Sequence, residues 1–84
     1  MGENTFGGAI AALKAGEKLA RLGWNGKGIF IKLQVVDENS FMQSSYIYID
    51  TMSLQTDNPN AAKTRVPWLA SQTDMLADDW EIVE

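Results

Sequence analysis

Apolar residues recur at helical spacing near the start of the chain, at Phe6, Ala9, Ile10 and Leu13. Residues three and four positions apart lie on one face of a helix, so this pattern predicts a helix with one buried face. Thr5 precedes the pattern, and threonine is a residue type that favours the N-cap. Gly16 follows the pattern, and glycine readily adopts the left-handed conformation that ends many helices. The predicted helix therefore lies between these two residues.

Most of the remaining chain has the pattern of short strands. The expected strands cover residues of about 17–24, 29–36, 46–50, 52–56, 63–67 and 80–83. The dipeptide Asn25-Gly26 separates the first two, and it favours the type I′ turn of a β-hairpin. The strand 29–36 starts with apolar residues on both faces, which is typical of a strand that is covered on both sides. In so short a chain, the second cover would be a subunit partner or a ligand.

Residues 46–50 alternate regularly, with tyrosines on one face and isoleucines on the other. The strands 52–56 and 63–67 are expected to pair with each other across the turn residues 57–60. Ser71 and Asp74 have the spacing of a capping box, which predicts a short helix over about 72–77 with Met75 and Leu76 pointing inward. The predicted fold is α+β: a small antiparallel β-sheet with one longer N-terminal helix and one short C-terminal helix.

The length and composition place limits on this fold. A chain of 84 residues and 9.3 kDa supports one domain, spanning residues 1–84. The absence of cysteine excludes disulfides and thiolate metal sites, and the absence of histidine removes the commonest metal ligand. No apolar run approaches the roughly 18 residues of a membrane span, and no signal-peptide pattern opens the chain. We therefore expect a cytoplasmic protein with no membrane partner.

The charge is unevenly distributed along the chain. Residues 1–36 carry five basic and two acidic side chains, whereas residues 37–84 carry two basic and nine acidic ones. The net charge of −4 gives no general field for holding a DNA or RNA duplex. The basic first half could bind a small anion locally, and the alternative interpretation is a solvated surface of mixed charge.

No catalytic constellation is apparent. Without histidine or cysteine, nucleophilic catalysis would need a Ser-Lys pair or a carboxylate, and no segment presents one at recognisable spacing. Gly26-Lys27-Gly28 lacks the longer glycine pattern of a phosphate loop, and the acids at 74–81 lack calcium-loop spacing. The sequence predicts a protein that is not an enzyme and that uses no metal or cofactor.

The three tryptophans are the unusual feature of the composition. Trp80 alternates with Ile82 on the terminal strand and is expected in the core. Trp24 and Trp68 lie at loop junctions, beside Asn25-Gly26 and Pro67. There a flat ring can stack on a base at about 1–3 kcal/mol per base, or it can belong to the core.

Three segments of the chain carry a resemblance to a known family. They are Thr5-Phe6 with the alanine-rich helix, residues 20–28 (ARLGWNGKG), and above all residues 66–83 (VPWLASQTDMLADDWEIV). The sequence resembles a family of short phage and prophage proteins that includes the Thoeris anti-defense 2 proteins.

The resemblance implies a sponge function. Such proteins bind, without cleaving, the glyco-cyclic ADP-ribose signal made by bacterial TIR-domain enzymes during phage infection. They are homotetramers with ligand pockets where subunits meet, and some relatives also capture cyclic oligonucleotide signals. The expected location is the cytoplasm of the infected bacterial host.

A pocket for such a ligand needs stacking surfaces and a few polar groups. We expect Trp24 and Trp68 to supply stacking surfaces, with Phe30 as a further apolar wall. Arg21 or Lys27 would add positive charge.

Three polar residues complete the predicted site. Asn25, Ser71 and the N–H groups that open the short helix would address phosphate or ribose oxygens. Asp74 would accept from a ribose hydroxyl or an adenine amine, and the alternative is that it serves only as the acid of the capping box.

Two other functions remain open at this stage. A phage protein–protein binding module that inhibits a host protein would use the same aromatic residues as contact hot spots. A structural component of the virion is the other alternative.

Overall fold

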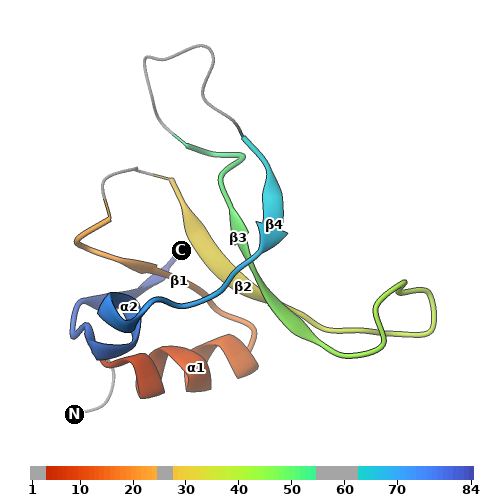
Figure 1. Ribbon diagram of the computed structural model, residues 1–84, viewed down its shortest axis with the longest axis horizontal. Helices are drawn as coiled ribbons and strands as arrows, with labels where there is room; N and C mark the ends of the chain where they lie inside the picture. Colours follow the sequence, from red (N-terminus) through yellow and green to blue (C-terminus); the bar gives the residue numbers. More distant parts are fainter. Residues whose placement is uncertain (1–3, 25–27, 55–62) are drawn as a thin grey trace.

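The computed structural model describes residues 4–24, 28–54 and 63–84. Within these residues the elements are α1 (Phe6–Lys14), β1 (Lys18–Arg21), β2 (Phe30–Gln34), β3 (Tyr46–Asp50), β4 (Arg65–Pro67), α2 (Gln72–Leu76) and β5 (Trp80–Val83). The strands form one antiparallel sheet in the order β4-β3-β2-β1-β5 (Figure 1). The predicted α+β fold, with a longer N-terminal and a short C-terminal helix, is confirmed.

The ends of α1 agree with the sequence. The Thr5 hydroxyl accepts a hydrogen bond from the backbone N–H of Gly8 at 3.1 Å, as an N-cap does. Gly16 has a φ of +94°, the left-handed conformation in which glycine is favoured after a helix. Ala9 and Leu13 are buried, so the predicted apolar face is the one that packs.

The register of the sheet separates two kinds of side chain. β2 and β3 pair so that Ile31 lies opposite Ile49 and Leu33 opposite Ile47. Successive side chains of a strand point to opposite faces, so these four residues share one face. The residues between them lie on the other face, and Lys32 there lies opposite Tyr48.

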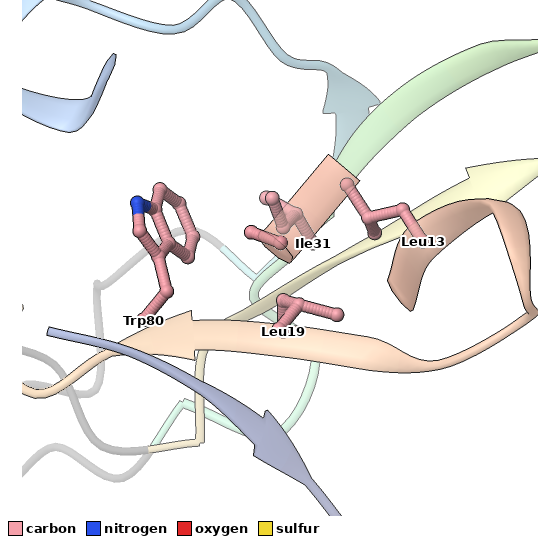
Figure 2. Packing of buried hydrophobic residues seen from close by; sticks show 5 residues of the cluster. Leu13, Leu19, Ile31 and Trp80 are labelled. Carbon is pink, nitrogen blue, oxygen red and sulfur yellow. The ribbon is translucent and has the colours of Figure 1, made fainter. Parts of the chain in front are cut away.

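The core lies between α1 and the first of these faces. Its fully buried members are Ala9, Leu13, Leu19, Ile31 and Trp80. Figure 2 shows Leu13 of α1 beside Leu19 of β1 and Ile31 of β2. Helix α1 also contacts β5 and α2, so both helices lie on this face (Figure 1). In the part of the chain that the structure describes, the opposite face carries neither helix.

Two strand predictions need correction. Residues 52–54 do not form a strand, because the N–H of Leu54 donates to the carbonyl of Thr51 at 3.0 Å and closes a turn. The Asp50 carboxylate stabilises this turn by accepting from the N–H of Met52 at 2.8 Å. Strand β4 pairs with β3 instead, with Ile49 opposite Val66. Strands β1 and β2 are also shorter than predicted, and the Asn25-Gly26 turn lies outside the described residues.

The prediction that Met75 and Leu76 point inward is also wrong. Both are exposed, and Leu76 keeps 79% of its surface accessible. Helix α2 has only five residues, and it contacts the core through the flanking Ala77. A helix this short presents little of its surface to a core, so the positions of its caps decide which residues are covered.

Among the described residues, none of the helices has the length and apolar character needed to cross a membrane.

Candidate functional site

Four aromatic rings gather between the helices and the sheet, and we call them the tryptophan cluster: Phe6, Trp24, Trp68 and Trp80. The Trp80 centroid lies 5.5 Å from that of Trp24 and 6.0 Å from that of Trp68, both edge-on. The Trp24 and Trp68 centroids are 6.5 Å apart. Trp80 is fully buried, as predicted, whereas Trp24 and Trp68 are half-buried. These two rings therefore contribute to packing and also reach the surface.

Backbone hydrogen bonds position the rings. The N–H of Trp24 donates to the carbonyl of Arg21 at 3.2 Å, in the turn that follows β1. The N–H of Trp68 donates to the carbonyl of Ile47 at 2.9 Å, just beyond β4. The indole N–H of Trp80 donates to the carbonyl of Asp74 at 3.0 Å and so ties the core to α2. The cluster is consequently fixed from three parts of the chain.

Arg21 joins the end of β1 to the C-terminal segment. Its Nη1 donates to Asp74 Oδ1 at 3.0 Å, and its Nε donates to Asp79 Oδ1 at 2.8 Å. Asp79 Oδ2 also accepts from the N–H of Gly23 at 2.7 Å. The hydrogen bond from Arg21 is the main cause that holds the pKa of Asp79 below its ordinary value. The bond to Asp79 likewise contributes most to raising the pKa of Arg21.

Asp74 is the centre of this network. Burial on its own would raise the pKa of Asp74, but hydrogen bonds from Ser71, Arg21 and Trp24 outweigh burial and lower it. The Ser71 hydroxyl accepts from the N–H of Asp74 at 3.1 Å, and the N–H of Ser71 donates to Asp74 Oδ2 at 3.0 Å. These reciprocal bonds confirm the predicted capping box. Asp74 is thus an ionised carboxylate whose oxygens already have partners.

The structure brings five of the eight predicted site residues to this end of the molecule: Arg21, Trp24, Trp68, Ser71 and Asp74. Phe30 is not among them, because it pairs opposite Asp50 on the other face of the sheet. Asn25 and Lys27 lie outside the described residues.

A small hollow borders this region. It has a volume of about 190 Å³ and is lined in part by Arg21, Leu22 and Trp24 and by Ala20, Glu81 and Val83 of the sheet, whereas Trp68, Ser71 and Asp74 do not line it. Pockets that enclose a drug-sized ligand have volumes of about 300–1,000 Å³. The hollow of one chain would therefore hold only part of a dinucleotide-sized ligand.

A larger hollow lies on the opposite face of the sheet, and we call it the sheet-face hollow. Its volume is about 440 Å³, and its lining includes Lys18, Phe30, Lys32, Tyr46, Tyr48 and Arg65. Sequence reasoning found only Phe30 among these. The alternation of Tyr46 and Tyr48 with isoleucines was a usable signal, since it already set the two tyrosines apart from the core.

A metal centre has no support in the described ranges, where no three histidine, cysteine, aspartate or glutamate side chains are grouped to hold an ion.

Comparison with known proteins gives the family. The sequence model of the Thoeris anti-defense 2-like domain matches residues 4–83. The protein named Thoeris anti-defense 2 from Bacillus phage SP01 is 36% identical over 92 residues, which cover 94% of this chain and 93% of that protein. The family match includes α1, the tryptophan cluster and the capping box. The chain belongs to the Thoeris anti-defense 2-like domain family.

Proposed function

We propose that this chain is a phage anti-defense sponge. It binds and sequesters, without cleaving, a cyclic ADP-ribose-type signal such as the glyco-cyclic ADP-ribose made by bacterial TIR-domain defence proteins. It acts in the cytoplasm of the infected host, where removal of the signal keeps the downstream effector inactive.

The observation that carries this proposal is the convergence of the predicted ligand residues. Trp24 and Trp68 are separated by more than forty positions in the sequence, yet their ring centroids are 6.5 Å apart. Arg21 lies beside them, because it binds Asp74, and Asp74 also accepts a hydrogen bond from the Trp24 side chain. Stacking surfaces next to a fixed guanidinium are the combination that an adenine ring and its attached phosphates require.

Each group has a distinct role in this proposal. The accessible parts of Trp24 and Trp68 stack on the base. Arg21 supplies positive charge, although its bonds to Asp74 and Asp79 leave only part of the guanidinium available. Ser71 and Asp74 hold α2 in place, so their contribution to binding is chiefly to position the rings.

The small volume of the hollow beside Trp24 favours a pocket shared between subunits. In one chain, the hollow beside Trp24 offers about 190 Å³, less than a ligand with two phosphates and two sugars needs. We therefore propose a homotetramer in which a second copy completes the pocket. Light scattering of the protein at micromolar concentration should give about four times 9.3 kDa, and a monomer mass would contradict this assembly.

The sponge function is tested by the fate of the ligand. Glyco-cyclic ADP-ribose is incubated with the protein, free ligand is removed by filtration, and the retained complex is heat-denatured and analysed by chromatography. Release of intact ligand is expected. Release of a cleaved product would indicate an enzyme, and the absence of retained ligand would contradict sequestration.

One observation favours a second candidate, a module that binds and inhibits a host protein. Leu69 is 91% exposed and Leu76 is 79% exposed, and both lie on the segment that joins β4 to β5. A large contiguous apolar patch marks a protein contact surface, and these two leucines would contribute to such a patch. If Leu69→Ser and Leu76→Ser abolish anti-defense activity but leave tetramer mass and ligand retention unchanged, this second function is supported.

A further inference from the structure

The sheet face opposite the helices gathers charge and aromatic rings in one place. Strand alternation puts Lys32, Tyr46 and Tyr48 on this face, because their neighbours Ile31, Ile47 and Ile49 pack toward the core. The resulting hollow has a volume of about 440 Å³, within the range of small-molecule sites. None of the tryptophan-cluster rings lines it.

The charge of this hollow is opposite to that of the whole chain. Lys18, Lys32 and Arg65 line it together with a single carboxylate, that of Asp50, so the local net charge is +2. The chain as a whole carries −4. A concave surface of one sign focuses the electrostatic field and raises the local concentration of counter-ions. The hollow therefore attracts anions although the protein as a whole repels them.

Asp50 positions one of these cations. It is buried, and its Oδ2 accepts from Arg65 Nε at 2.8 Å while its Oδ1 accepts from the N–H of Met52. Burial by itself would raise the pKa of Asp50, but the bonds from Arg65 and Met52 lower it, so the carboxylate stays ionised. The bond uses only Nε of an exposed Arg65 side chain, which leaves both Nη groups to meet an anion.

Neither lysine forms a salt bridge among the described residues, although Lys18 is near enough to Asp50 to be one of the charges that lower the pKa of that carboxyl. Lys18 Nζ lies 5.0 Å from the centroid of the Phe30 ring, and this cation–π contact holds the ammonium over the sheet without neutralising it. Lys32 forms no ion pair within residues 4–24, 28–54 and 63–84. Both ammonium groups therefore have hydrogen-bond donors available for a ligand.

We propose that the sheet-face hollow is a binding site for a phosphate-bearing ligand with a planar ring, of about the size of a nucleoside diphosphate. Lys18, Lys32 and Arg65 contact the phosphates, and the rings of Tyr46 and Tyr48 contact the planar group. This site lies on the other face of the sheet from the tryptophan cluster and does not depend on the function proposed for that cluster.

A second copy of the chain is a poorer occupant of this face. In a two-fold contact each subunit presents the same patch, so cationic groups would meet their own counterparts. Like charges brought together at an interface oppose association. An anionic ligand instead supplies negative charge that balances the net positive charge of the hollow.

The test uses the full chain and two probes, adenosine 5′-diphosphate and inorganic pyrophosphate, followed by calorimetry and by amide and indole NMR signals. Adenosine 5′-diphosphate should bind and shift the NMR signals of sheet-face amides, while the Trp24 and Trp68 indole signals stay in place. The double variant Lys18→Gln/Lys32→Gln should lose at least about tenfold in affinity, because hydrogen bonds to charged groups are lost. The matched control Lys14→Gln, on the exposed end of α1, should bind like the parent protein.

Several results would overturn the proposal. One is the absence of diphosphate binding at millimolar concentration. A second is unchanged affinity in the double variant, or an equal loss in Lys14→Gln. A third is a loss of affinity in Trp24→Ala equal to that in the double lysine variant, with the tetramer intact, because that would place the ligand at the tryptophan cluster. Pyrophosphate binding as tightly as the nucleotide would overturn the assignment of the planar group to the tyrosines.

The same measurements separate this site from the sponge function. The double lysine variant should still retain glyco-cyclic ADP-ribose, and Trp24→Ala should still bind the diphosphate. If one ligand does not bind, the result for the other ligand can therefore still be interpreted. Circular dichroism and light scattering on each variant show that a loss of binding is not a loss of fold.

Discussion

The tryptophan cluster and the sheet-face hollow occupy opposite faces of one sheet and use their polar groups differently. Beside the cluster, Arg21 is bound to two carboxylates, and Asp74 is also held by Ser71. In the hollow, Lys18 and Lys32 form no salt bridge among the described residues. The first region therefore offers rigid ring surface with its charges already paired, and the second offers unpaired charge.

The largest expected effect is on folding, from Trp80→Ala. Trp80 is fully buried and donates its indole N–H to the carbonyl of Asp74. Truncation of a buried aromatic costs about 3–5 kcal/mol, which would lower the melting temperature of a domain of this size by more than about 10 °C. Thermal denaturation followed by circular dichroism measures the change. Phe41→Ala is the matched control, because this ring is 97% exposed and its loss should leave the melting temperature nearly unchanged. Similar losses in the two variants would contradict the assigned core.

The next effect is on binding, from Trp24→Ala and Trp68→Ala. Loss of a stacking surface worth about 1–3 kcal/mol lowers the affinity for glyco-cyclic ADP-ribose roughly 5- to 150-fold. Both rings are half-buried and contact Trp80, so some stability is lost as well. Trp24→Phe keeps a ring at the position and should lose less affinity than Trp24→Ala. If both alanine variants are folded tetramers with undiminished affinity, the pocket lies elsewhere.

A smaller effect is expected from Ser71→Ala, which removes the N-cap of α2. Loss of such a cap costs about 1 kcal/mol, or a decrease of roughly 4–8 °C in melting temperature. Ser44→Ala, in an exposed loop, is a suitable control. A Ser71→Ala variant with parental stability and a large loss of ligand affinity would mean that the hydroxyl contacts the ligand directly.

The smallest expected effect is on the loss of folding stability at low pH. The pKa values of Asp74 and Asp79 are lowered in the folded chain, so the stabilisation they provide is present above their ordinary pKa of about 4. It is lost as the pH falls from there through the lower folded values. Arg21→Gln weakens this dependence, because Arg21 is a cause of both shifts. Urea unfolding at pH 7 and pH 3 should show a smaller loss in Arg21→Gln than in the parent. Equal losses would contradict the role of Arg21, and solvent screening keeps the difference modest.

Features decided by a few adjacent residues were predictable from the sequence. The N-cap at Thr5, the Ser71–Asp74 capping box and the alternation at residues 46–50 are all local, and all are present in the structure. The turn at 52–54 was not predicted, because it depends on Asp50, which is itself held by Arg65 from fifteen positions away. The exposure of Leu76 depends on where a five-residue helix meets the core, which periodicity does not determine.

The candidate sites differ in the same way. The resemblance led to eight predicted site residues, and the structure brings five of them together at the tryptophan end. There Arg21 binds Asp74 across more than fifty positions of the sequence. The sheet-face hollow was missed because Lys18, Lys32 and Arg65 come from three strands. These side chains lie on one face because of the register in which the strands pair. That register cannot be deduced from the number of residues between the strands.

Sequestration of the signal at the tryptophan end can be tested on three proteins in parallel. Glyco-cyclic ADP-ribose is incubated with the parent protein, Trp24→Ala and Lys18→Gln/Lys32→Gln, and the ligand retained after filtration is released by heat and identified by chromatography. We expect intact ligand from the parent and the lysine variant, and little or none from folded Trp24→Ala. Intact ligand from Trp24→Ala with none from the lysine variant, or a cleaved product from any of the three, would contradict this expectation.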